Sequence, residues 1–145
     1  MSTFTLFYGV PSGCSFGSIV ALEWSGLPYQ LCRIEMPAQC NTEEYRQINP
    51  VGETPALLYD NGKVLTESIA ILNHVMAKSL NAAFHYEQGT EQFNMFNQKL
   101  AFLNTTLFNA FSPLWYSLEH SSSESNKQAL REYGAAQVKR AFTAL

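Results

Sequence analysis

The stretch PALLYDNGKVLTESIAILNHVMAK, residues 55–78, combines two short apolar runs, a turn signal and the start of a helix. The apolar runs flank Asp-Asn-Gly at 60–62, which favours a tight β-hairpin because Asn and Gly accept the positive φ angles of such turns. From Thr66 onward apolar residues recur at helical spacing, so a helix is predicted to begin in T-E-S-I and to run to about Lys78. A hairpin followed by a helix therefore closes one folding unit.

The residues before this stretch predict an alternation of strands and helices. β-branched and aromatic runs indicate strands, and apolar residues at helical spacing indicate helices. The predicted elements are a strand over 3–9, a helix over 15–25, a strand over 29–34 and a short helix that Thr42 caps and Pro50 ends. This order implies an α/β domain with a mixed four-stranded sheet, helices on its faces and a right-handed crossover between the first two strands.

The residues after this stretch have a different pattern. Residues 80–90 are polar, and apolar residues from Phe93 to Leu114 are spaced by threes and fours, which predicts a long helix bent at Ser112-Pro113. Ser121 and Glu124 have the spacing of a capping box, which predicts a further helix to the last residue. Two such helices need more helices or a partner to cover their apolar faces, so we expect this second domain to be incomplete or obligately associated. The predicted domains are 1–79, a linker over 80–90, and an all-α domain over 91–145.

The composition excludes several classes of protein. The chain has 145 residues, is 46% hydrophobic and 14% charged, and has a formal net charge of −3. It has no apolar run long enough to span a membrane, no signal-peptide pattern and no basic stripe for nucleic acid. We therefore expect a cytoplasmic protein that does not bind nucleic acid directly.

The cysteines set the main chemical question. Cys14, Cys32 and Cys40 follow no disulfide or zinc spacing, and the three histidines follow no metal-ligand pattern. Cys32 is expected in the core and Cys40 in a loop. Cys14 is either a small buried hydrophobe or a reactive thiol. Turn residues precede it and a helix follows, so we expect the helix N-terminus to lower its pKa. Gly17 three residues later rules out a two-cysteine redox motif.

Motifs at four places in the chain together resemble the glutathione S-transferases, most of all their bacterial beta class, which is the cysteine-containing class. These motifs are LFY and GCS near the first strand, INPVGETPALL before the hairpin, LTESIAI at the third helix, and SPLW in the long helix. The resemblance implies a thioredoxin-like N-terminal domain, an all-helical second domain and a homodimer. It also implies glutathione as cosubstrate.

The resemblance assigns roles to five residues. Cys14 would be the catalytic thiol. Thr54 would offer its backbone to the cysteinyl part of glutathione, beside a cis peptide bond at Pro55. Glu67 and Ser68 would bind the γ-glutamyl end, where a carboxylate suits the ammonium group, and a hydroxyl with a helix N-terminus suits the carboxylate. Simple capping of the helix is the alternative role for this pair.

The chain also departs from the family pattern. Phe108 and Asn109 stand where the beta class usually has histidine and lysine, Ala101 stands where it has asparagine, and the segment EMPAQCN contains no lysine. Tyr8 and Ser12 occupy positions from which other classes activate the thiol, although ring packing in a strand for Tyr8 and a turn role for Ser12 are the favoured explanations.

Two functions follow from the resemblance. The first is a glutathione transferase, in which bound glutathione attacks an electrophile or exchanges with a disulfide at Cys14. The alternative is a non-catalytic interaction protein with the transferase fold, similar to the stringent starvation proteins. Cys14 with Glu67 and Ser68 favours the enzyme, and Phe108 favours the interaction protein. No metal is expected in either case.

Overall fold

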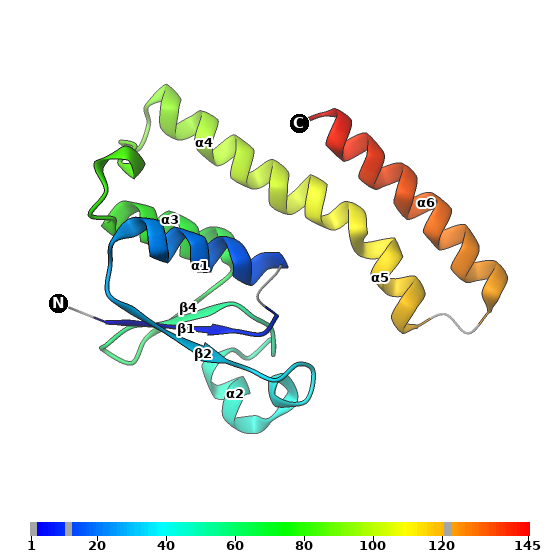
Figure 1. Cartoon of the computed structure of the whole chain (residues 1–145), viewed down its shortest axis with the longest axis horizontal. Helices are drawn as coiled ribbons and strands as arrows, with labels where there is room; N and C mark the ends of the chain where they lie inside the picture. The colour runs from blue at the N-terminus through cyan, green and yellow to red at the C-terminus, as the bar shows by residue number, and fades with distance from the viewer. Residues whose placement is uncertain (1–2, 11–12, 121–122) are drawn as a thin grey trace. The chain divides into compact units, whose positions relative to one another are not determined.

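The computed structural model describes residues 3–10, 13–120 and 123–145. The chain divides into two compact units, Met1–Tyr86 and Glu87–Leu145. Each unit is built from consecutive elements, which Figure 1 labels. We describe each by itself.

The first unit alternates strands and helices in the predicted order. Its regular elements are β1 (Phe4–Tyr8), α1 (Gly13–Ser25), β2 (Tyr29–Arg33), η1 (Gln39–Asn41), α2 (Glu43–Ile48), β3 (Ala56–Leu58), β4 (Val64–Thr66), α3 (Ser68–Lys78) and η2 (Ala82–Phe84). As predicted, Thr42 caps α2, because its hydroxyl accepts a hydrogen bond from the Tyr45 N–H. The predicted thioredoxin-like arrangement is confirmed.

The four strands form one mixed sheet in the order β2-β1-β3-β4. β1 pairs in parallel with β2, with Leu6 opposite Leu31, and antiparallel with β3, with Leu6 opposite Leu57. β3 and β4 form the predicted hairpin. At its turn the Tyr59 N–H donates to the Lys63 carbonyl (2.9 Å), and Gly62 has a φ of 80°, a value that glycine adopts without strain.

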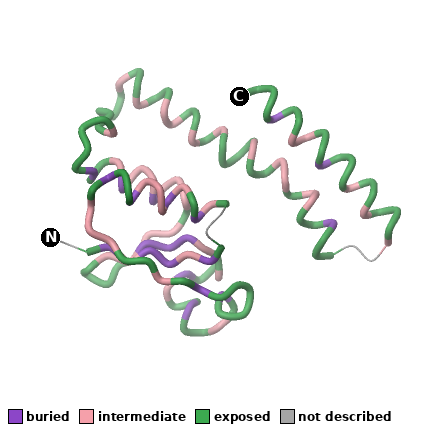
Figure 2. Tube along the Cα trace, in the orientation of Figure 1, coloured by how far each residue is buried: buried purple, intermediate pink, exposed green. Residues whose placement is uncertain are grey.

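The sheet has a core on each face, because successive side chains of β1 point to opposite sides. α1 and α3 lie side by side on one face and α2 lies on the other (Figure 1). Phe4 and Leu6 belong to the cluster that also contains residues of α1, β3 and α3, namely Leu22, Leu57, Ile71 and Val75. Phe7 belongs to the second cluster, with Ile34, Cys40, Tyr45 and Ala56. Among the strands, the buried residues therefore lie on β1 and β3, the two middle strands of the sheet (Figure 2).

α3 begins at Ser68, within the predicted T-E-S-I, and Thr66 is the last residue of β4. One local prediction in this unit was wrong. Cys40 does not lie in a loop but in the short helix η1, and its side chain is only 3% exposed. Its carbonyl lies so near Gly52 that a Cβ there would be 2.7 Å away, which keeps this part of the chain tightly packed.

The second unit is helical, as predicted. It contains α4 (Glu91–Ala101), the π-helical segment η3 (Phe102–Phe108), η4 (Asn109–Phe111), α5 (Ser112–Glu119) and α6 (Glu124–Thr143). The predicted helix over 93–114 is thus a series of helical segments whose hydrogen-bonding pattern changes at η3 and again at η4. The Ser121 of the predicted capping box lies outside the described residues.

α5 and α6 pack against each other at a close approach. A Cβ on Gly134 of α6 would lie 2.8 Å from the Leu114 Cγ, so only glycine fits without a shift. Few residues of this unit are buried (Figure 2), and among its described hydrophobic residues only Ala141 is classed as buried. Among the described helices of the chain, none is long and apolar enough to cross a membrane.

Candidate functional site

Cys14 is the second residue of α1, the first helix after β1. Gly13, the first residue of α1, has a φ of 59°, which lets the chain turn sharply into the helix. The Cys14 side chain is half-buried and shares a hydrogen bond with the Ser68 side chain at the start of α3. The thiol thus lies where two helices begin.

The thiol pKa of Cys14 differs from the prediction. Burial raises it above its ordinary value, and the nearby carboxylates of Glu53 and Glu67 raise it further. The hydrogen bonds from Ser68 and from the Cys14 backbone lower it, but by less. The expectation of a lowered pKa was wrong because the helix N-terminus is accompanied by partial burial and two negative charges. In the free chain, Cys14 keeps its proton at neutral pH.

Thr54 is bound to the elements on either side of Cys14. Its hydroxyl oxygen accepts from the Gly9 N–H at 3.2 Å and from the Ser15 hydroxyl at 3.5 Å. The same hydroxyl donates to the Met36 sulfur at 3.6 Å. The Thr54–Pro55 peptide bond is cis, and Pro55 is buried. These contacts hold the segment before β3 against the end of β1 and the first turn of α1.

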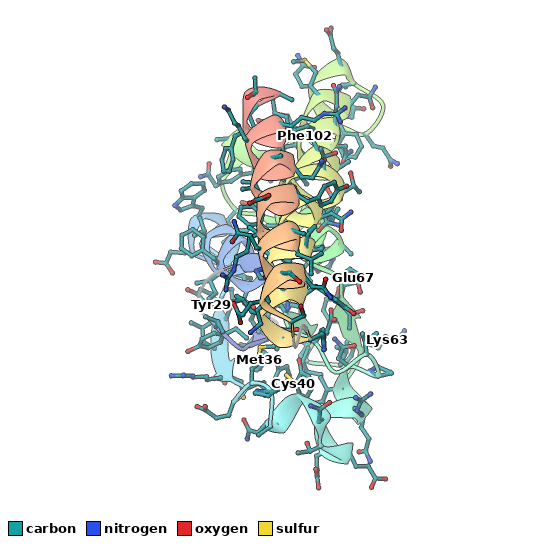
Figure 3. The ribbon with its side chains drawn as sticks, turned by 90° about the vertical axis from the view of Figure 1, so that its right-hand side faces the viewer. Tyr29, Met36, Cys40, Lys63, Glu67 and Phe102 are labelled. Atoms are coloured by element: carbon teal, nitrogen blue, oxygen red, sulfur yellow. The ribbon has the colours of Figure 1, made fainter. Side chains whose placement is uncertain are left out.

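Glu67 has an unusual backbone. It lies between β4 and α3 with a φ of 67°, the only positive φ among the described residues other than glycine. Although it is the N-cap residue of α3, its side chain makes no capping hydrogen bond and is exposed (labelled in Figure 3). A strained residue with an unused carboxylate argues against the capping role and for a role toward a ligand.

The structure therefore brings the predicted site residues of the first unit together. Cys14, Ser68 and Glu67 interact directly, and Thr54 is linked through Ser15, the neighbour of Cys14. Two contributors were missed. Glu53 and Ser15 lie in the quoted motifs, next to residues that were assigned, and this adjacency was the available signal.

The other candidates contribute less. Tyr8 is half-buried in β1, and Ser12 lies outside the described residues. Cys32 is half-buried and packs against the second core cluster, as expected for a strand residue. Phe108 lies in the second unit, where its ring packs on Trp115 with a centroid distance of 4.8 Å. Among the described residues, no group of His, Cys, Asp and Glu is arranged to hold a metal ion.

The chemistry of this cluster suits a ligand with both an ammonium and a carboxylate group. Two carboxylates, Glu53 and Glu67, provide negative charge, and none of the residues described around Cys14 is a lysine or arginine. The first backbone N–H groups of α3 have no partner inside the helix and favour an anion. A thiol and two hydroxyls complete the cluster.

Comparisons with known proteins place the chain in a family. Residues 2–77 match the family described as "Glutathione S-transferase, N-terminal domain". The chain is 26% identical over 136 residues to glutathione S-transferase GST-4.5 of Xanthomonas campestris, covering 94% of this chain and 66% of that protein. The structure of a sphingomonad glutathione S-transferase complexed with glutathione superposes with a TM-score of 0.79 at 26% identity, covering 97% of this chain and 67% of that one. The beta-class glutathione S-transferase of Sphingomonas chungbukensis gives a TM-score of 0.78 at 26% identity, with the same coverage. The chain thus spans about two thirds of the length of these relatives.

Proposed function

Because the chain belongs to the glutathione S-transferase family through its N-terminal domain, we propose that its first unit binds glutathione at the cluster around Cys14. The observation that supports this most is the convergence of Cys14, Thr54 and Ser68 from three separate elements. A relative that is 26% identical carries glutathione in its solved structure.

Different parts of the cluster bind different parts of glutathione. The Glu67 carboxylate pairs with the ammonium of the γ-glutamyl group, and the Ser68 hydroxyl with the first N–H groups of α3 holds the carboxylate of that group. Thr54 pairs its backbone with the cysteinyl part, as one strand pairs with another. The cysteinyl sulfur then lies on the Cys14 side of the cluster.

The reaction that we propose is conjugation of glutathione, through its sulfur, to an electrophile. The glutathione thiolate forms a carbon–sulfur bond, and the leaving group departs with the electron pair of the bond that breaks. Cys14 keeps its proton at neutral pH, since burial and two carboxylates raise its pKa. It is therefore suited to donate a hydrogen bond to the glutathione thiolate. Disulfide exchange at Cys14 requires the Cys14 thiolate and is slower at this pH.

Titration calorimetry with glutathione tests this proposal. We expect binding by the wild-type chain and binding about thirtyfold weaker, about 2 kcal/mol, in Glu67→Gln, because the ligand ammonium loses its charge partner. Glu43→Gln is the matched control, since Glu43 also lies in the first turn of a helix of the first unit. Equal affinities in all three proteins would refute the assignment of Glu67, and no binding by the wild type would refute the function.

The interaction-protein reading remains the second candidate. Phe108 replaces the family's histidine, and the two carboxylates near Cys14 disfavour its thiolate. A chain with this function binds glutathione weakly or not at all and shows no conjugation of it to 1-chloro-2,4-dinitrobenzene. Binding together with turnover would exclude this candidate.

We further propose that the protein is a homodimer in which part of residues 93–114 lies at the interface. Many large apolar side chains of the second unit are exposed, among them Met95, Leu103, Phe108, Trp115, Tyr116, Leu118 and Phe142. Such an apolar surface is rarely left in water. Light scattering at micromolar concentration should give twice the mass of the chain, and a stable monomer would refute the proposal.

A further inference from the structure

Two buried side chains, Tyr45 of α2 and Asn49 directly after it, converge on a single carbonyl oxygen beside the proposed glutathione site. The Tyr45 hydroxyl donates to the Glu53 carbonyl at 2.7 Å, and the Asn49 side-chain amide donates to the same oxygen at 2.8 Å. Tyr45 and Asn49 are each only 3% exposed. Burial raises the pKa of Tyr45 to about 12, so its hydroxyl keeps its proton and stays a donor at any physiological pH.

These donors are held in place by their own surroundings. The Tyr45 ring packs edge-to-face on Phe7, with a centroid distance of 6.2 Å. The Asn49 side-chain oxygen accepts from the Val51 N–H at 3.1 Å, and the Asn49 carbonyl accepts from the Gly52 N–H at 2.9 Å. A donor whose position is fixed in this way gives direction as well as stability to the carbonyl that it binds.

The direction of the Glu53 carbonyl decides the direction of the Thr54 N–H. The Glu53–Thr54 peptide is trans, and in a planar trans peptide the C=O and the following N–H point in opposite directions. The two donors, Tyr45 in α2 and Asn49 at its C-terminal end, therefore turn the Thr54 N–H away from α2. No group among the described residues accepts a hydrogen bond from this N–H.

The Thr54 side chain is also held in place, by hydrogen bonds from the β1 and α1 side. Its hydroxyl is bound by the Gly9 N–H and lies 3.5 Å from the Ser15 hydroxyl. The Thr54 N–H is thus oriented relative to α1, which carries Cys14, by hydrogen bonds on both sides.

We infer that Tyr45 and Asn49 are positioning residues, which aim the Thr54 N–H at the cysteinyl carbonyl of bound glutathione. This inference rests on the proposed function, because it needs glutathione as the ligand. It assigns α2, which contains none of the residues proposed to contact the ligand, to the recognition of the cysteinyl part alone.

Two ligands separate positioning from a general loss of structure. Glutathione has the cysteinyl carbonyl, and γ-glutamylethylamide has the γ-glutamyl group without it. We expect Tyr45→Phe to weaken glutathione binding about fivefold to tenfold, the worth of one hydrogen bond, and to leave γ-glutamylethylamide within about twofold. Asn49→Ala should act in the same direction. Tyr29→Phe is the control, because it also removes a tyrosine hydroxyl that donates a hydrogen bond, here to Glu23 at 2.6 Å.

Amide order parameters of the free proteins give a second measurement that needs no ligand. The order parameter of the Thr54 N–H should fall in Tyr45→Phe and remain unchanged in Tyr29→Phe. The inference is overturned if the wild type binds glutathione and Tyr45→Phe binds it equally well, or if both ligands weaken to the same extent. Absence of glutathione binding by the wild type overturns the proposed function itself, and with it this role, whereas an unchanged Thr54 order parameter overturns only the positioning.

Discussion

Replacement of Glu67 by glycine should stabilise the fold and weaken glutathione binding in the same variant. Glu67 has a φ of 67° and a ψ of 119°, a combination that a residue with a Cβ adopts only under strain. Its side chain gives no capping hydrogen bond in return. Glycine removes the steric conflict and removes the carboxylate, so stability and binding are expected to move in opposite directions.

The magnitudes follow from these two effects. Such backbone strain costs about 1–3 kcal/mol, and the greater freedom of glycine in the unfolded chain offsets about 0.5–1 kcal/mol of the gain. The net stabilisation of Glu67→Gly should therefore lie between about 0 and 2.5 kcal/mol. The lost charge partner should weaken glutathione about thirtyfold, as in Glu67→Gln.

Urea denaturation and calorimetry on the same protein samples measure both quantities. Glu67→Gln keeps the strained backbone and loses only the charge, so it should match Glu67→Gly in affinity and the wild type in stability. A glycine variant that is less stable than the wild type would refute the strain argument. A glycine variant that binds glutathione normally would refute the role of the carboxylate.

Three further predictions concern residues away from Glu67. Alkylation of Cys14 by iodoacetamide should show its pH inflection above that of an ordinary thiol, and Ser68→Ala should move the inflection higher, because it removes a hydrogen bond that stabilises the thiolate. Gly17→Ala should stabilise the protein by about 0.5–1 kcal/mol in urea denaturation, since Gly17 lies in α1 with open space around its Cα, whereas Gly134→Val should destabilise it by about 1–3 kcal/mol through overpacking. Burial lowers the pKa of His74, so the stability it supports should be full above about pH 6.5 and fall with decreasing pH at no more than about 1.4 kcal/mol per pH unit, a slope that is absent in His74→Leu.

The fold of the first unit could be predicted from the sequence because the patterns that indicate its strands, turns and helices are local. The Asp-Asn-Gly turn, the Thr42 cap and the alternation within β1 each depend on a few neighbouring residues, and all agree with one sheet order. The start of α3 within T-E-S-I was predicted, but the positive φ of Glu67 was not, because a pattern of residue types does not show such a backbone conformation.

The remaining errors depend on tertiary structure. Apolar residues spaced by threes and fours fit an α-helix and a π-helical segment equally well, so η3 could not be distinguished from α4. The pKa of Cys14 depends on Glu53, which is distant in sequence and adjacent only in the fold. The sequence placed Tyr45 in a short helix and Asn49 in the INPVGETPALL motif, but it did not show that both side chains donate hydrogen bonds to the Glu53 carbonyl.

The position of β1 in the middle of the sheet has a consequence for the synthesis of the chain. β1 is made first, and β2 soon offers a partner for one of its edges. The other edge stays unpaired until β3, which ends at Leu58, leaves the ribosome. Leu58 follows Tyr8, the last residue of β1, by 50 residues, so at about 5–20 residues per second this interval lasts about 2.5–10 seconds. During it, Leu6 and its neighbours present an open apolar strand edge to other nascent chains. The tight turn at Gly62 then allows β4 to join β3 quickly and to complete the sheet.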